Sequence, residues 1–546
     1  MSEPTFSVAA MTINGRSQPL GIGADDVSFA WTLSSGERGA VQSAYRIRVG
    51  TTEGSNDLWD SGRVASDQQV DVELPTNLHL APATRYYWQV KAWNGDGVAS
   101  GWSAPAWFET GLLSAADWSG AKWIAHATPA SPLLRGVVEL TKEVRSARIH
   151  ASARGLYRLS INGRIVGDEY LAPGWTDYAR RIQAQTHDVT SLLRKGPNVL
   201  GAALGGGWYR GKVGLGWRGV YGDTLAFVAK LHVTYADGST ASFVTDDGWR
   251  SADGPYVQTD LQDGESYDAR LEQPGWDRPG FDASKWSPVA VVTDDVTKLV
   301  PQPDEPVRAT EVLTARTRNM PAPGEHVYDV GQNMVGVARV RLNGKKGQTV
   351  RIRYAEELYR SGERRGRLYT ENFRSAKVTD TYTFARDEVV TYQSTFTQHG
   401  FRYIEITGLD APPESKDVHG VVLCSDLTDI GDLRLSHPML DQLVRNIRWG
   451  QRGNFVSIPT DTPARDERLG WTGDISVFAP TASRYQDTRA FLSKWMDDVR
   501  DSQRTDGNIP AVVPQPGNEF EETGLGWSDA FITVPYAVWR ATGDTR

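Results

Sequence analysis

Cysteine is nearly absent from this chain of 546 residues, which contains Cys424 and no other. A single thiol can form neither an internal disulfide bond nor a thiolate metal cluster. The nine histidines are dispersed, without the i, i+4 or HxH spacing of a zinc site. No GxxxxGK[ST] string is present for cradling a nucleotide phosphate. The sequence therefore predicts no metal ion and no cofactor.

Long hydrophobic runs and basic clusters are also missing. No window approaches the roughly 18 apolar residues of a membrane span, so no membrane partner is predicted. The start, MSEPTFSVAAMTINGRSQPL, lacks a basic n-region and an apolar h-region, so the expected location is cytoplasmic. The net charge is −8 with scattered lysine and arginine, which argues against a nucleic-acid partner. A homo-oligomer is kept as an open alternative.

Aromatic residues and glycine are abundant, with 19 Trp, 20 Tyr and 54 Gly. Indole and phenol rings suit the C–H faces of sugars, but β-sandwich cores use the same rings as filler, and composition alone favours the second reading. The length is too great for one hydrophobic core, so three or four domains are expected.

Period-2 alternation with Gly, Asn, Asp and Pro turns predicts β-sandwiches over the first three quarters of the chain. In the first unit, Tyr45, Ile47 and Val49 alternate with arginines, and tight hairpins are expected at Asn162-Gly163 and Asp237-Gly238. The predicted units are a fibronectin III- or immunoglobulin-like sandwich at 1–112, a jelly-roll-like sandwich at 113–300 and a further sandwich at 301–428.

The pattern changes to helices near residues 425–432. Apolar residues recur at helical spacing after His437, again over residues 491–499, and a further helix is expected to begin near Asp529. Pro438 suits a first helical turn. Residues 429–546 are therefore predicted to be helical, with long loops between the helices.

The loop at residues 457–482 concentrates charge. It holds Asp461, Asp466, Glu467 and Asp474, interleaved with Arg465, Arg468 and Trp471. A carboxyl group crowded by like charges and an indole would have a raised pKa, as a general acid near neutral pH requires. The alternative is structural, with both arginines pairing with the acids and Asp474 capping the next helix. Gly470 and Gly473 argue against a continuous helix here, and spacing alone leaves both readings open.

Several strings resemble one family. DTPARDERLGWTGD at 461–474 and WGQRGNF at 449–455 are similar to the catalytic signature of the family 78 glycoside hydrolases, the α-L-rhamnosidases. GWTDYARRIQAQTHDVT, GWYRGKVG, YDVGQNMVGVARV and HGFRYIEI resemble the β-domains that precede that family's catalytic barrel. The resemblance implies a multidomain fold, with N-terminal β-sandwiches followed by the first part of an (α/α)6 helical barrel.

The resemblance also implies residue roles. Glu467 matches the general acid that protonates the departing glycosidic oxygen. The family's mechanism is inverting, in which a second carboxylate, about 6.5–9.5 Å from the acid, activates water. The substrate would be a glycoside or polysaccharide with terminal non-reducing α-L-rhamnose. The positions that match substrate-binding residues are Asp461, Arg465, Asp474, Trp471, Trp527 and Asp529.

The helical stretch is shorter than such a barrel needs. Helices of about 11–12 residues with connections of about 4–6 require on the order of 200 residues. The chain is therefore expected to be C-terminally incomplete, with the general base beyond residue 546. Three other readings stay open: a non-catalytic carbohydrate-binding fragment, an inactive truncated relic, and another hydrolase or phosphorylase on the same barrel.

Weaker acidic signals lie in the β region. Asp177 and the run DGESYDARLE at 263–272 could bind calcium or sugar, but turn and cap roles are the favoured interpretation.

Overall fold

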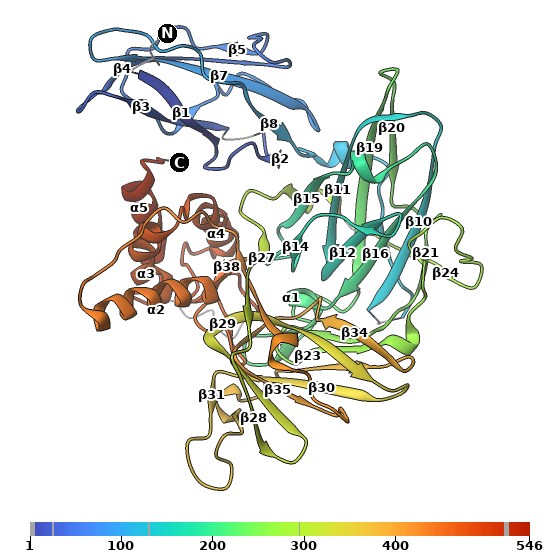
Figure 1. Cartoon of the computed structure of the whole chain (residues 1–546). Helices are drawn as coiled ribbons and strands as arrows, with labels where there is room; N and C mark the ends of the chain where they lie inside the picture. The colour runs from blue at the N-terminus through green and yellow to red at the C-terminus, as the bar shows by residue number, and fades with distance from the viewer. Residues whose placement is uncertain (1–5, 25–26, 129–130, 294, 518–523, 546) are drawn as a thin grey trace.

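The computed structural model describes residues 6–24, 27–128, 131–293, 295–517 and 524–545, and runs from β-sandwiches into a helical region (Figure 1). The β-rich part ends with β36 at Ser425, and α2 begins at Pro438. This order confirms the predicted fold class. Within the described ranges, no helix combines the length and apolar character that a membrane crossing needs.

The N-terminal sandwich has two sheets with one shared core. The alternation predicted for β4 is confirmed, because Tyr45, Ile47 and Val49 are buried while the intervening arginines are partly exposed. One sheet has the order β1(Phe6–Ile13)-β3(Ser28–Ser35)-β6(Val72–Glu73). The other has the order β2(Leu20–Ile22)-β8(Ala106–Thr110)-β7(Arg85–Asn94)-β4(Gln42–Gly50)-β5(Trp59–Asp60).

A second pair of sheets follows. The hairpin predicted at Asn162-Gly163 joins β12 to β13, and both residues have positive φ, +54° and +79°. The first sheet has the order β13(Arg164–Ile165)-β12(Leu156–Ile161)-β16(Gly196–Gly205)-β10(Pro132–Leu140)-β21(Arg250–Asp253)-β24(Ser287–Pro288). The second has the order β25(Ala290–Val292)-β9(Trp123–Ala125)-β19(Ala226–Tyr235)-β11(Val144–Arg154)-β15(Ile182–Asp188)-β26(Leu299–Pro301), with β20(Thr240–Val244) also on β19 across the predicted Asp237-Gly238 hairpin.

The next sheet draws strands from two of the predicted units. Its order is β14(Glu169–Tyr170)-β27(Val307–Thr314)-β36(Val418–Ser425)-β29(Glu325–Gly344)-β35(His399–Thr407)-β30(Thr349–Ala355)-β33(Thr379–Thr383)-β23(Gly264–Asp268)-β22(Tyr256–Asp260), with β28(Thr317–Ala322) and β34(Glu388–Gln393) also on β29. β14, β22 and β23 come from the 113–300 stretch, so this sheet joins it to 301–428. The short pairs are β17(Lys212–Val213)-β18(Trp217–Arg218), β31(Glu357–Leu358)-β32(Leu368–Tyr369) and β37(Phe455–Val456)-β38(Ile458–Pro459).

Within the described residues, the helices are α1(Gly207–Arg210), α2(Pro438–Asn454), α3(Thr472–Tyr485), α4(Arg489–Ser502) and α5(Ala530–Thr542). The predicted starts of α2 and α5 are confirmed, since His437 and Asp529 are their N-cap residues. The loop predicted at 457–482 is wrong in its second half, which forms α3. Gly473 and Pro480 lie inside that helix, where tertiary packing overrides their poor helix propensity.

The helical region is fixed against the β-domains through α4. Arg181, which precedes β15, forms ion pairs of 2.9 Å with both Asp497 and Asp501 of α4. Short 3₁₀ turns occur at η1(Ala115–Trp118), η2(Thr190–Leu192), η3(Ala269–Leu271), η4(Val296–Lys298), η5(Glu371–Phe373) and η6(Ser415–Asp417). η5 lies beside the loop between β38 and α3, since the Asp466 N–H approaches the Phe373 carbonyl (3.4 Å).

Candidate active site

The acidic loop, residues 460–471, connects β38 to α3 and is closed on itself. The Asp461 N–H donates to the Leu469 carbonyl (3.0 Å), and the Leu469 N–H donates to Asp461 Oδ1 (2.8 Å). Gly470 lies directly on another backbone segment, since a Cβ there would be 1.9 Å from the Val513 carbonyl oxygen. Glycine is needed for this close approach. The sequence thereby folds the loop so that its carboxylates converge.

Glu467 is held by three donors. Its Oε2 accepts from Arg465 Nε and from an Arg374 Nη, both at 2.8 Å, and its Oε1 accepts from Trp471 Nε1 at 3.1 Å. Burial alone would raise the pKa of Glu467, but the hydrogen bonds and positive charges of the two arginines outweigh burial and hold this pKa below its ordinary value. Glu467 is therefore a carboxylate at neutral pH.

The raised pKa belongs to Asp461 instead. Burial is the largest cause and the negative charge of Glu467 adds to it, which together bring the pKa of Asp461 to about 7. Arg465 is farther from Asp461, with a closest N–O distance of 3.8 Å. The predicted rise in pKa for a crowded carboxyl group of this loop is found at Asp461 and not at Glu467, because Arg465 and Arg374 both lie within hydrogen-bond distance of Glu467.

Asp461 and Asp474 line a pocket of about 320 Å³ between α2 and α3. Its walls include Phe455 and Phe478, so the pocket combines apolar surface with two carboxyl groups. Burial, and then the charge of Glu467, raises the pKa of Asp474. A small apolar pocket with a few polar groups is typical of a ligand site. The alternative role of Asp474 as a helix cap is wrong, because the α3 N-cap is Trp471 and no side chain caps it.

None of the other predicted site residues lines this pocket. Trp471 donates to Glu467 and is half-buried. Trp527 packs over the start of α3, where a Cβ on Gly473 would be 2.9 Å from its Nε1. Asp529 is exposed at the N-cap of α5. In the part of the chain that the structure describes, no hydrogen bond or ion pair joins the Asp529 carboxyl group to the acidic loop.

Arg468 does not pair with the acids as the alternative reading supposed. Its guanidinium group is buried and donates to the carbonyl oxygens of Leu261 (2.6 Å), Gln398 (2.8 Å) and Ala464 (3.0 Å). Arg468 thereby ties the loop to the β-domains.

Arg374 and the structural role of Asp466 were not predicted. Asp466 Oδ2 accepts from the Ser375 N–H (2.9 Å), and its Oδ1 forms an ion pair of 2.5 Å with Arg374 Nε. Arg374 and Glu467 are 93 residues apart in the chain. No local pattern in the sequence marks this contact.

The other acidic candidates serve as turn and cap residues. Asp177 accepts from the Ala179 N–H (2.9 Å), and Asp268 caps η3 through the Arg270 N–H. Asp263 forms ion pairs with Lys212 (2.8 Å) and Arg218 (2.7 Å). No group of metal-binding side chains is found among the residues that are described.

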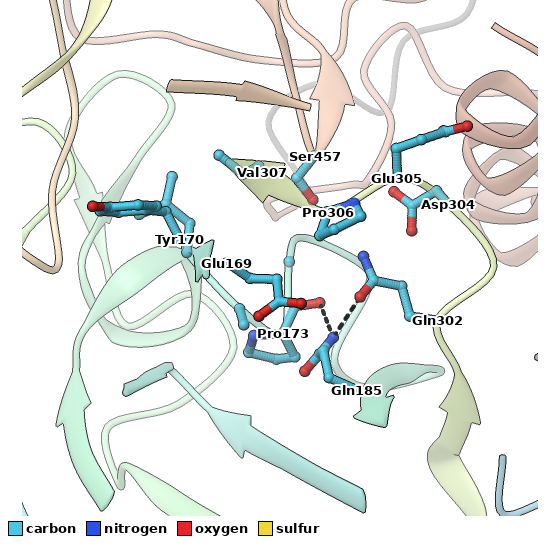
Figure 2. A pocket seen from close by; sticks show the side chains of 13 residues that line it. Glu169, Tyr170, Pro173, Gln185, Gln302, Asp304, Glu305, Pro306, Val307 and Ser457 are labelled. Atoms are coloured by element: carbon cyan, nitrogen blue, oxygen red, sulfur yellow. Dashed lines mark hydrogen bonds between the residues drawn. The ribbon is translucent and has the colours of Figure 1, made fainter. Parts of the chain in front are cut away.

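A second pocket lies where β14, β15 and the segment after β26 meet (Figure 2). Gln185 points into it and donates to the Pro173 carbonyl (3.2 Å) and to Gln302 Oε1 (3.1 Å), the two dashed lines in Figure 2. None of the predicted site residues lines it. The acidic loop is thus the stronger candidate for an active site.

Comparison with protein families assigns four matches along the chain. They are a Rha78A-like N-terminal immunoglobulin domain (residues 8–114), an alpha-L-rhamnosidase N-terminal domain (142–311), a bacterial alpha-L-rhamnosidase concanavalin-like domain (319–424) and a bacterial alpha-L-rhamnosidase 6 hairpin glycosidase domain (428–546). The acidic loop lies within the last match.

Curated proteins and solved structures agree with these family matches. The chain is 36% identical to an alpha-L-rhamnosidase of Streptomyces avermitilis, over 97% of this chain and 68% of the relative, and 39% identical to one of Formosa agariphila, over 97% and 59%. The crystal structure of the Streptomyces avermitilis alpha-L-rhamnosidase complexed with L-rhamnose superposes with a TM-score of 0.91, at 35% identity, over 99% of this chain and 69% of that one. By sequence and by fold, the chain belongs to the α-L-rhamnosidase family of glycoside hydrolases.

Proposed function

We propose that this chain supplies the acid side of an active site that releases terminal non-reducing α-L-rhamnose from glycosides or polysaccharides. The observation that carries the proposal is the pair formed by Glu467 and Asp461, whose pKa values are shifted in opposite directions, beside an apolar pocket that Asp461 lines. The relative from Streptomyces avermitilis supports L-rhamnose as the ligand, because its structure is complexed with that sugar.

The chemistry needs a proton on the departing oxygen. The pKa of Asp461 is raised to about 7, so near neutral pH Asp461 can hold a proton beside the Glu467 carboxylate, and the two groups titrate as a pair. When a substrate oxygen approaches, that proton is transferred to Glu467 and onward to the glycosidic oxygen as the C1–O bond breaks. The carboxylate left behind is stabilised by Arg465 and Arg374. Trp471 keeps the acting carboxyl group in place.

We propose an inverting mechanism for the second half of the reaction. Water would attack C1 from the opposite face while a second carboxylate accepts its proton, so the first product is the opposite anomer. We place this second carboxylate outside residues 1–546, since the chain spans only 59–68% of the curated relatives described above. Proton NMR of the first-formed anomer tests this part of the proposal, because a retained configuration would contradict it.

Two measurements test the proposed activity. L-rhamnose should bind to the 546-residue chain in calorimetry, and aryl α-L-rhamnoside should be hydrolysed by a form extended with the C-terminal part of the Streptomyces relative. Glu467→Gln should suppress turnover most for poor leaving groups, since these depend on protonation. Glu357→Gln, an exposed carboxylate of β31, is the matched control. Equal losses with good and poor leaving groups would remove Glu467 from its role.

A carbohydrate-binding role without catalysis is the second candidate. It is favoured by the presence of Asp461 and Asp474 in the pocket, which suits hydrogen bonding to sugar hydroxyls. Rhamnose binding by the 546-residue chain, combined with an extended form that hydrolyses no aryl α-L-rhamnoside, would support this second role.

A further inference from the structure

A residue of the β-domains reaches into the acidic loop. Arg374 follows η5, in the connection between β32 and β33, and its guanidinium group contacts both Asp466 and Glu467. The same guanidinium donates to the Asp466 carbonyl oxygen, and the next residue, Ser375, donates its N–H to Asp466 Oδ2 (2.9 Å). The Asp466 N–H in turn approaches the Phe373 carbonyl (3.4 Å). Residues 373–375 therefore contact residues 466–467 through both backbone and side-chain groups.

The backbone of Arg374 is itself constrained. Its φ is +55° and its ψ is −110°, in a region that favours glycine over any residue with a side chain. Such an unfavourable conformation is retained where several surrounding contacts stabilise it, and these conformations are common at functional sites. Glycine would be easier to accommodate here, but glycine carries no guanidinium group.

We infer that Arg374 is a positioning residue for Glu467, contributed to the active site by the β-sandwich that precedes the helical region. The inference rests on the proposed function. Arg374 and Arg465 approach the same oxygen, Oε2, while Trp471 holds Oε1, so the three donors fix the carboxyl plane. Arg374 alone among the three comes from outside the loop, and it thus couples the position of the acid to the docking of two domains.

The charge around Glu467 sets the effect of losing Arg374. Two cations face this carboxyl group, Arg465 and Arg374, and the acids near it are Asp461, Asp466 and Asp474. Removing one of the two cations leaves the negative charge around Glu467 less compensated, so Glu467 should take up a proton at higher pH. A merely structural contact between domains would change stability without moving this titration.

Fluorine NMR of protein labelled with 5-fluorotryptophan measures the titration without turnover or sugar. Trp471 donates to Glu467, so its resonance, assigned with Trp471→Phe, reports the charge of that carboxyl group. All forms carry Asp461→Asn, because the pKa of Asp461 is about 7 and depends on the charge of Glu467. In this background the inflection that Glu467→Gln abolishes should lie below about pH 4.5. In the same background, Arg374→Gln and Arg374→Gly should each move this inflection to higher pH, by about one pH unit. Arg374→Lys should restore most of the wild-type behaviour.

Arg374→Gly keeps the backbone conformation accessible, so it decides the test if Arg374→Gln folds poorly. Arg364→Gln is the matched control. Arg364 forms an ion pair with Glu371, an exposed residue of η5 (3.0 Å), and this variant should leave the titration unchanged. The inference is overturned if neither Arg374 variant moves the inflection, if Arg364→Gln moves it equally, or if Trp471 proves insensitive to Glu467. Failure to hydrolyse rhamnosides would contradict the proposed function and leave this result intact.

Discussion

Lys494 and Asp498 lie one turn apart on α4 and form an ion pair of 2.8 Å that is almost completely enclosed, with side chains 2% and 0% exposed. The Lys494 ammonium group also donates to the carbonyl oxygens of Trp175 and Ser457. Trp175 belongs to the jelly-roll-like part, and Ser457 immediately precedes β38. One buried cation therefore connects a β-domain, a barrel helix and the segment leading to the acidic loop.

Removing this cation should destabilise the helical region. Lys494→Met leaves Asp498 buried without its counter-ion, which costs about 3–5 kcal/mol in comparable cases. The double variant Lys494→Met/Asp498→Leu should recover much of the loss, because no uncompensated charge remains. Thermal unfolding followed by circular dichroism measures both. A single variant as stable as wild type would show that the pair is not enclosed as described.

Glu265 should make stability depend on pH. The pKa of Glu265 is raised from 4.5 to about 8, and burial is the largest cause of this rise. Hydrogen bonds from the N–H groups of Phe396 and Thr395 oppose it. The folded protein thus keeps a proton that the unfolded chain releases above its ordinary pKa. The contribution of protonated Glu265 to the free energy of unfolding is fully present below about pH 4.5 and is lost as the pH rises towards 8.

The corresponding measurement compares melting temperatures over this pH window. Glu265→Gln keeps an amide oxygen for the two N–H groups and should flatten the decline seen in wild type between about pH 5 and pH 8. Glu363→Gln, at an exposed position, should leave the decline as it is. Identical curves for wild type and Glu265→Gln would contradict the assignment.

Gly470 should tolerate no side chain. Its Cβ would be 1.9 Å from the Val513 carbonyl oxygen, and the Val513 N–H donates to the Gly470 carbonyl (2.9 Å). Gly470→Ala should therefore destabilise the protein by about 1–3 kcal/mol through overpacking and should weaken rhamnose binding. Gly450→Ala on α2, where nothing lies within 4 Å, should be neutral or stabilising by up to about 1 kcal/mol. Chemical denaturation followed by tryptophan fluorescence distinguishes the two variants.

Gly473 offers a test of Trp527 that separates binding from stability. Alanine at this position gains helix propensity in α3, but its Cβ would be 2.9 Å from Trp527 Nε1, so the indole must move. If Trp527 contacts the sugar, Gly473→Ala should lower rhamnose affinity about five- to tenfold in calorimetry without lowering the melting temperature. Unchanged affinity would place Trp527 outside the sugar site.

The helices that carry regular apolar spacing could be predicted from the sequence, and α2 and α5 begin at the expected residues. The first turn of α3 could not, because Gly473 lies in it and disfavours a helix locally, as Pro480 does farther along the helix. Gly473 is accommodated because Trp527 packs against it, a contact between residues far apart in the chain. Local propensity is a weak guide where tertiary packing decides.

The acidic loop itself was identified from its residue pattern, but its charge distribution was not. Sequence shows that the arginines and acids are close together, whereas the direction of each side chain decides which acid keeps a proton. Arg374 illustrates the same limit, since β32 and β33 bring it to Glu467 from another domain. The roles of the substrate-binding residues, the domain boundaries at 112, 300 and 428, and the cytoplasmic location stay predictions.

β23 and β33 pair in parallel, so one sheet contains strands from both sides of residue 300. β26 likewise crosses back to pair with β15. A cut near residue 300 would leave bare strand edges on both pieces, and such edges invite aggregation. In domain-swap engineering, residues 113–428 would have to be exchanged as a single cassette, however many family matches subdivide them.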